Sequence, residues 1–230
     1  MSELRTYNDL LTAFVAINNK LVVLKESLTC TDVDARPVAI SGIQQAIAGY
    51  YMGMNSMCWN RSPEEVVRSL GESNLSPDVA RKIVEDTWRL GLLTLCHFRI
   101  DSLFHNLLRA FRRTPSRSFS KNSTELLALC RLPVDSREAD SLKVLTSLRN
   151  SLHNNGIHRS ASESFTIGTL RYDFNESKAV QCAGWSHSLT AIDAVCDALG
   201  ALLLSNTVVA LPSPVRDDLA HALASGDAVD

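Results

Sequence analysis

The longest helical pattern in the chain begins at Ser76 and constrains the fold more than any other stretch. Ser76-Pro77-Asp78 combines a capping serine, a proline in the first helical turn and an acid near the positive end of the helix dipole. Apolar residues then recur every three or four positions as far as Arg113, and Pro115 ends the pattern. The sequence therefore predicts one helix much longer than its neighbours.

Shorter helical patterns lie on both sides of it. Ser62-Pro63-Glu64-Glu65 repeats the same start signal, and Asp135 with Glu138 three residues later resembles a capping box. A nearly continuous apolar pattern near the end of the chain is typical of a helix that is central to the core. The further helices expected are at about 3–28, 39–60, 62–71, 124–130, 136–153, 186–208 and 215–223.

The apolar period changes after the Asn154-Asn155-Gly156 stop signal. Apolar residues at 165–172 and 179–182 flank the polar segment 173–178, which predicts a β-hairpin with that segment as its turn. No repeat or linker is evident, so we expect one domain over 1–230: a mainly all-α antiparallel bundle with one small hairpin before the last long helix. Its core would span about 39–210, with an N-terminal helix over 1–30 and a helix with a loose tail over 213–230.

Composition limits the classes of function. The chain has 230 residues, 45% of them hydrophobic, and a formal net charge of -2, so attraction to nucleic acid requires a local basic patch. The six cysteines are scattered without a C-x-x-C pair, which favours free thiols and no metal or other cofactor. No apolar run reaches eighteen residues and Met1-Ser2-Glu3 lacks a basic start, so we expect a cytoplasmic protein with no membrane partner.

One dense basic cluster covers the end of the longest helical pattern and the loop beyond it. Its cations are interleaved with Phe111 and Phe119, and cations with aromatic rings are the groups that phosphates and unstacked bases require. A solvated basic face at a helix C-terminus explains the same residues without any ligand. The candidate RNA-binding residues are Arg109, Arg112, Arg113, Arg117 and Lys121.

The most specific chemical pattern is Leu148-Arg149-Asn150-Ser151-Leu152-His153-Asn154-Asn155-Gly156. Arg149 and His153 are four positions apart, so on a helix they lie on one face and can both contact one phosphate-sized group. Each follows a leucine of the buried stripe by one position, which places it at the border of the core. We therefore expect both side chains to line a cleft or an interface.

This motif, with antiparallel helices before it and a closing helix after it, resembles the HEPN superfamily, in particular its stand-alone bacterial members. The resemblance covers about 39–210 loosely and residues 148–156 specifically. It implies a helical bundle that forms a homodimer and acts as a metal-independent endoribonuclease. A toxin or defence role, with an antitoxin or other partner protein, is also implied by the resemblance. Arg149 and His153 would then be catalytic, and Asn150 and Asn154 would be supporting polar groups.

The chemistry of these residues suits that activity. A histidine can exchange the protons of RNA cleavage near neutral pH, and arginine suits the charge that develops on phosphorus. Three alternatives remain: a non-catalytic RNA- or nucleotide-binding or dimerisation module, a helix end in which Arg149 and His153 only stabilise the last carbonyls, and a metal-dependent bundle enzyme. The absence of paired Glu-x-x-His sequences speaks against the last.

Overall fold

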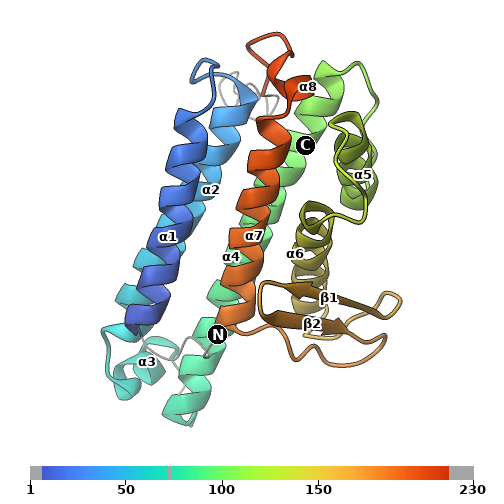
Figure 1. Ribbon diagram of the computed structural model, residues 1–230. Coiled ribbons are helices and arrows are strands. Elements are labelled where there is room, and N and C mark those ends of the chain that lie inside the picture. The colour runs from blue at the N-terminus through green and yellow to red at the C-terminus, as the bar shows by residue number, and fades with distance from the viewer. Residues whose placement is uncertain (1–6, 72–73, 218–230) are drawn as a thin grey trace.

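Helix α4 runs the length of the computed structural model, which describes residues 7–71 and 74–217 (Figure 1). Successive long helices alternate in direction around it, so the described part of the chain is a mainly α-helical antiparallel bundle with one small β-hairpin, as the sequence predicts. The elements are α1 (Tyr7–Glu26), α2 (Ala35–Met54), the π-helix η1 (Asn55–Trp59), α3 (Pro63–Ser69), α4 (Pro77–Ala110), α5 (Phe119–Leu129), α6 (Arg137–His153), β1 (Glu163–Ile167), β2 (Leu170–Phe174), α7 (Trp185–Leu203) and α8 (Asn206–Val209).

Serine caps begin the helices that the start signals predict. The Ser62 side chain accepts a hydrogen bond from the Glu65 N–H, and the Glu65 carboxylate accepts one from the Ser62 N–H, which completes a capping box at α3. Ser76 caps α4 in the same position. At α6 the cap is Ser136, which accepts from the Ala139 N–H, so the predicted pairing of Asp135 with Glu138 is wrong by one position.

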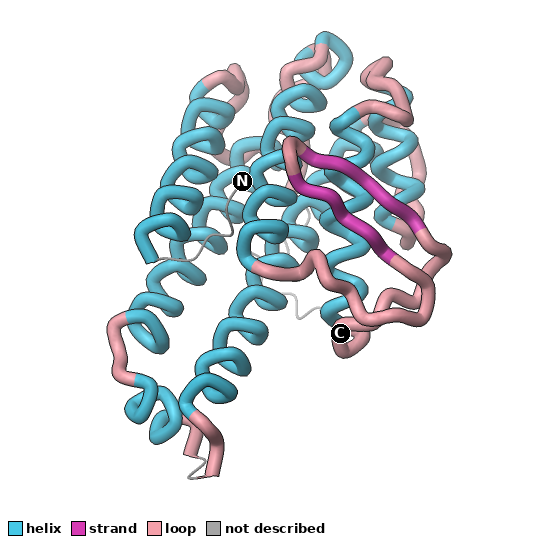
Figure 2. The backbone as a smooth tube through the Cα atoms, turned by 60° about the horizontal axis from the view of Figure 1, so that its bottom comes forward, coloured by secondary structure: helices cyan, strands magenta, loops and turns pink. Residues whose placement is uncertain are grey.

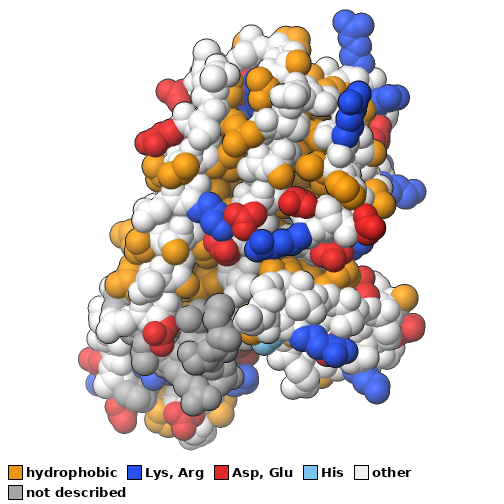
Figure 3. Space-filling view, viewed as in Figure 1, with side chains coloured by type: hydrophobic (Ala, Val, Ile, Leu, Met, Phe, Trp, Pro, Cys, Tyr) orange, Lys and Arg blue, Asp and Glu red, His pale blue; other side chains and the backbone are white. Residues whose placement is uncertain are grey.

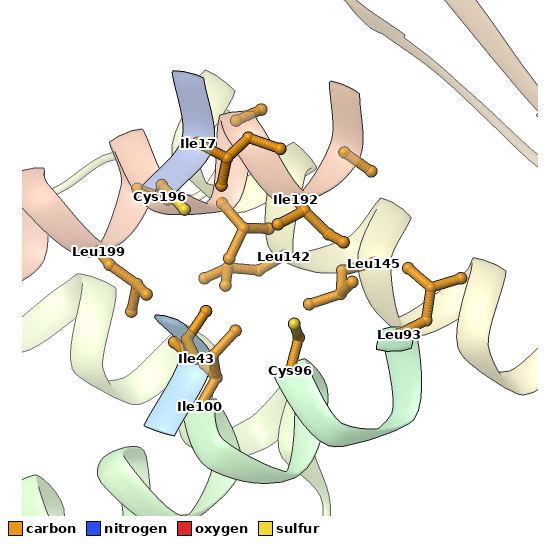
Figure 4. Packing of buried hydrophobic residues seen from close by; sticks show 14 of the residues in the cluster. Ile17, Ile43, Leu93, Cys96, Ile100, Leu142, Leu145, Ile192, Cys196 and Leu199 are labelled. Atoms are coloured by element: carbon orange, nitrogen blue, oxygen red, sulfur yellow. The ribbon is translucent and has the colours of Figure 1, made fainter. Parts of the chain in front are cut away.

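The hydrophobic core lies between α1, α2, α4, α6 and α7 (Figure 4). Each of these helices turns a stripe of apolar side chains toward the others, because residues three and four apart share a helix face. Figure 4 shows the side chains that meet there, which include Ile17, Ile43, Leu93, Cys96, Ile100, Leu142, Leu145, Ile192, Cys196 and Leu199. Because α4 and α6 both belong to this core, any site between them has walls fixed by packing.

The β-hairpin differs from the prediction in its turn. β1 and β2 are antiparallel and Ile167 pairs with Leu170, so the chain reverses at Gly168 and Thr169. Gly168 has a φ of +61°, a conformation that glycine adopts without strain. The polar segment 173–178 therefore is not the turn between the paired strands, and within 179–182 only Ala179 pairs, in an isolated bridge with Ile157. Figure 2 shows the hairpin lying across the outside of the helices.

Several helix ends also differ from the expected ones. α2 begins at Ala35 because Asp34 caps it, and α5 begins at Phe119, where Ser118 caps it. The last long helix ends at Leu203, and Ser205 then caps the short α8, because serine hydrogen-bonds the backbone N–H of a new helix start. Residues 215–217 are not helical, and the rest of the helix expected at 215–223 lies outside the described residues.

Ion pairs tie three helices together on the outer surface. Lys20 of α1 lies 2.7 Å from Asp193 and 2.8 Å from Asp197 of α7, and Arg137 of α6 lies 3.5 Å from Asp197. Figure 3 shows basic and acidic side chains together across the middle of this face. No helix among the described residues has the length and apolar character needed to cross a membrane.

Candidate functional site

A cleft of about 1030 Å³ opens between α4 and α6 and is bounded by the start of α5 and by β1. The residues of α4 that line it recur at three and four from Thr87 to Asp101, so a single face of this helix forms one wall. α6 supplies the facing wall from Leu142 to Asn150. The volume is that of a site for an organic ligand of moderate size.

Arg149 lies in the wall that α6 provides. The side chain is half-buried and its Nη1 donates a 2.9 Å hydrogen bond to Oδ1 of Asn150, which also lines the cleft. Its Nε is buried and has no hydrogen-bond partner among the described residues. A guanidinium cannot lose its charge, so an unsatisfied donor of this kind is a natural contact for an anionic acceptor.

His97 of α4 lines the same cleft. Its ring packs against Phe119 in a tilted arrangement with the centroids 4.3 Å apart. Its Nε2 is buried and has no hydrogen-bond partner among the described residues. Burial and the positive charge of Arg149 lower the pKa of His97 from 6.5 to about 4. His97 is therefore neutral at physiological pH in the free protein.

Two acids accompany these groups. Asp101 lies one turn beyond His97, and burial raises its pKa although His105, Asn122 and Arg149 act in the opposite direction. Glu163 of β1 accepts a hydrogen bond from the Ser147 hydroxyl, which links the edge of the hairpin to α6.

Part of the cleft lining is apolar. Phe98 lines it with 49% of its surface exposed, and Leu90 and Leu95 lie on the same face of α4. Tyr50 of α2 reaches the cleft because Gly91 has no side chain, since a Cβ at position 91 would collide with the Tyr50 hydroxyl. The cleft thus joins a cationic region to an aromatic and aliphatic region.

Only part of the predicted motif faces this cleft. Arg149 and Asn150 line it, as their position at the border of the core predicts. His153 is exposed at the last position of α6 and does not line this cleft, so only the expected position at an interface remains as a prediction for it. Asn154 is the C-cap residue and its N–H bonds to the carbonyl of Asn150.

The basic cluster is spread over the joined ends of α4 and α5, and Figure 3 shows basic side chains along this edge. Arg117 is the member that lines the cleft. Arg113 lies 3.8 Å from Glu125, in an exposed ion pair. Arg109, Arg112 and Lys121 are exposed and do not line the cleft, so Arg117 is the member of the cluster that shares the cleft with Arg149.

Sequence reasoning missed His97, Phe98 and Asp101 as site residues. The available signal was a second face of the longest helix, on which polar and aromatic residues recur at three and four from Thr87 to Asp101 beside the buried stripe. That face can be recognised as the wall of a cleft only when α6 is known to lie opposite it. The sequence does not show this pairing of helices.

Among the described residues, no three His, Cys, Asp or Glu side chains are grouped in a way that could hold a metal ion. No protein-family model matches the chain, and neither a curated protein nor a solved structure matches it significantly.

Proposed function

We propose that the chain binds RNA in the cleft between α4 and α6, with Arg149 as the principal phosphate-binding group. The observation that carries this proposal is the state of the Arg149 side chain. Its Nη1 donates a hydrogen bond to Asn150, while its buried Nε has no partner among the described residues. The cleft that it lines is large enough for a nucleotide. Arginine presents its donors in a fixed fork that matches the oxygens of a phosphate.

The charge of the cleft supports the same ligand. Arg117, Lys143 and Arg149 are its three cations, and Asp101 and Glu163 are its two acids, so its formal charge is +1 although the whole chain carries -2. A local positive site of this kind attracts phosphate independently of the net charge.

Phe98 supports RNA rather than a simple phosphate. A half-exposed aromatic ring beside a cationic region is the arrangement on which an unpaired base stacks. Single-stranded RNA exposes such bases, whereas paired bases are hidden within the duplex.

A second candidate is metal-independent cleavage of RNA, which the resemblance to the HEPN superfamily implies. The observation in its favour is that His153 follows Arg149 by one turn of α6 and is exposed, so a strand bound at Arg149 or a second copy of the chain can reach it. A homodimer that joined two α6 ends would supply two histidines, one for each proton transfer. A toxin or defence role with a partner protein would follow from that activity.

Binding is tested by fluorescence anisotropy with labelled single-stranded hexauridylate. Arg149→Gln should weaken binding about tenfold or more, because a hydrogen bond to a charged group contributes about 1.5–3 kcal/mol. Arg68→Gln, an exposed change on α3 outside the cleft, is the matched control. Equal affinities of the Arg149 variant and the wild type would refute the proposed site.

Cleavage is tested by incubating the same RNA with the protein in EDTA and separating the products on a gel. His153→Ala should abolish cleavage, whereas His105→Ala, on α4 and outside the cleft, should not. Binding without any cleavage by the wild type would leave the non-catalytic RNA-binding module as the function.

A further inference from the structure

We infer that His97 is a second phosphate-binding group of the cleft and that it takes up a proton when RNA binds. This inference rests on the proposed function, because it requires an RNA phosphate beside Arg149. It assigns the histidine of the site to α4, outside the motif on α6.

The geometry places the His97 imidazole between the core and the cleft. One side of the ring is fixed against Phe119, and Phe119 itself stacks on Phe104 with the centroids 5.4 Å apart. The buried Nε2 lacks the hydrogen-bond partner that a buried polar atom ordinarily has. A phosphate oxygen in the cleft could accept a hydrogen bond from Nε2 of this ring. No group among the described residues accepts one from Nε2.

The charges around His97 come from each element that bounds the cleft. Arg149 and Lys143 lie on α6, Arg117 precedes α5, Asp101 is on α4 itself and Glu163 begins β1. The titratable hydroxyl of Tyr50 comes from α2. Of these, Arg149 is the group whose charge disfavours protonation of His97, after the effect of burial. A phosphodiester at Arg149 would offset that charge and would itself attract an imidazolium.

RNA binding and protonation of His97 should therefore favour each other. In the free protein the pKa of His97 is about 4, so the ring carries no proton at pH 6. Bound RNA raises this pKa, and a proton is taken up at any pH between the free and bound values. In that range the affinity should rise by up to about tenfold for each unit by which the pH falls.

The other two histidines near this region are clearly distinguishable. His105 lies 3.7 Å from Asp101 and outside the cleft, and His153 is exposed at the end of α6. Neither has the buried ring nitrogen without a partner that distinguishes His97. Proton uptake that depends on His97 alone would therefore identify the group.

The test is isothermal titration calorimetry with hexauridylate that has hydroxyl groups at both ends. Its phosphodiesters do not titrate near neutral pH, so any proton taken up belongs to the protein. Titrations at pH 6 in two buffers of different ionisation enthalpy give the number of protons bound. The wild type and His105→Gln, a control outside the cleft, should each take up a fraction of a proton on binding RNA. His97→Gln should bind RNA without proton uptake and with an affinity independent of pH.

A second measurement avoids the dependence on a variant that must fold. The NMR signals of the His97 ring in the wild-type protein should move toward imidazolium values as the RNA is added at pH 6. RNA binding without proton uptake, or uptake that persists in folded His97→Gln protein, would overturn this inference and leave the proposed function intact. Failure of the wild type to bind the RNA would overturn the proposed function as well.

Discussion

The carboxylate of Asp34, which caps α2, accepts a 2.8 Å hydrogen bond from the backbone N–H of Val215, 181 positions later in the chain. The same carboxylate lies 2.6 Å from the guanidinium of Arg36, and Arg36 donates a 3.1 Å hydrogen bond to the carbonyl of Val208. Asp34 and Arg36 are both buried. One buried ion pair thus holds the end of the described chain against the start of α2.

Asp34→Ala should destabilise the protein by about 3–5 kcal/mol, because it leaves the buried charge of Arg36 without its partner. Urea unfolding followed by circular dichroism measures this change. Asp32→Ala, an exposed change in the same loop, should alter the free energy of unfolding by less than about 0.5 kcal/mol. Similar losses in both variants would show that the ion pair has no special role.

The ion pair of Asp34 and Arg36 should also make the stability of the protein depend on pH. Burial opposes ionisation of Asp34, but hydrogen bonds from Arg36 and Val215 outweigh it and hold its pKa below the ordinary value of 3.8. A depressed pKa in the folded state stabilises the protein above the unfolded value, and this contribution is lost as the pH falls through the folded one. The wild type should therefore lose stability below about pH 4 more steeply than Asp34→Asn, as measured by thermal melts between pH 2 and 6.

Gly49 and Gly53 of α2 offer a matched pair of substitutions. A Cβ at Gly53 would collide with the ring of Trp88, and nothing lies within 4 Å of a Cβ at Gly49. Gly53→Ala should cost about 1–3 kcal/mol through overpacking, while Gly49→Ala should stabilise the helix by about 0.5–1 kcal/mol. Equal effects of the two changes in urea unfolding would contradict the close contact of α2 with α4.

Phe98→Ala should weaken binding of single-stranded hexauridylate by about 1–3 kcal/mol, the usual contribution of one stacked base. Because Phe98 is 49% exposed, the free energy of unfolding should change little. Ile83→Ala, at a similarly exposed position of α4 outside the cleft, is the control and should bind RNA normally. The RNA affinities of the wild type and the two variants are measured by anisotropy titration. Unchanged affinity of the Phe98 variant would show that its ring does not stack on a base.

The rate at which the buried cysteines are alkylated should show whether the core stays closed in the native protein. Burial raises the pKa of Cys96 to about 12 and that of Cys182 to about 11, so neither forms the reactive thiolate near neutral pH. Iodoacetamide at pH 8 should label these two residues slowly in the native protein and rapidly in urea, as measured by mass spectrometry of the peptides. Cys30, which is only half-buried, should be labelled before them. Rapid native labelling of Cys96 would show that the core opens.

The sequence predicts the helices well because their signals are local. Ser62 and Ser76 cap the helices that follow them, as expected from the proline and acids beside each serine. The hairpin turn was misplaced because the polar segment 173–178 carries a stronger turn composition than Gly168-Thr169, where the strands reverse. The break at Ser205 was missed because apolar residues resume at Val208 and Val209, after only three polar positions.

The candidate site was only half predictable for a different reason. The position of Arg149 beside Leu148 on α6 is a local property, and it correctly placed the side chain at the edge of the core. The same argument did not place His153 in the cleft, because α6 ends there and its side chain is exposed. The pairing of α6 with the His97 face of α4 depends on tertiary packing, which periodicity within one helix does not specify.

The joint role of α4 and α6 has a consequence for the kinetics of RNA association. Each of these helices places one face in the core and the adjoining face in the cleft, so the two walls are already positioned in the unliganded protein. A preorganised site needs little ordering of its own backbone when the ligand enters, and this lowers the entropic cost of association. Stopped-flow traces should therefore fit one exponential whose rate increases linearly with RNA concentration, without the plateau that a slow opening step imposes.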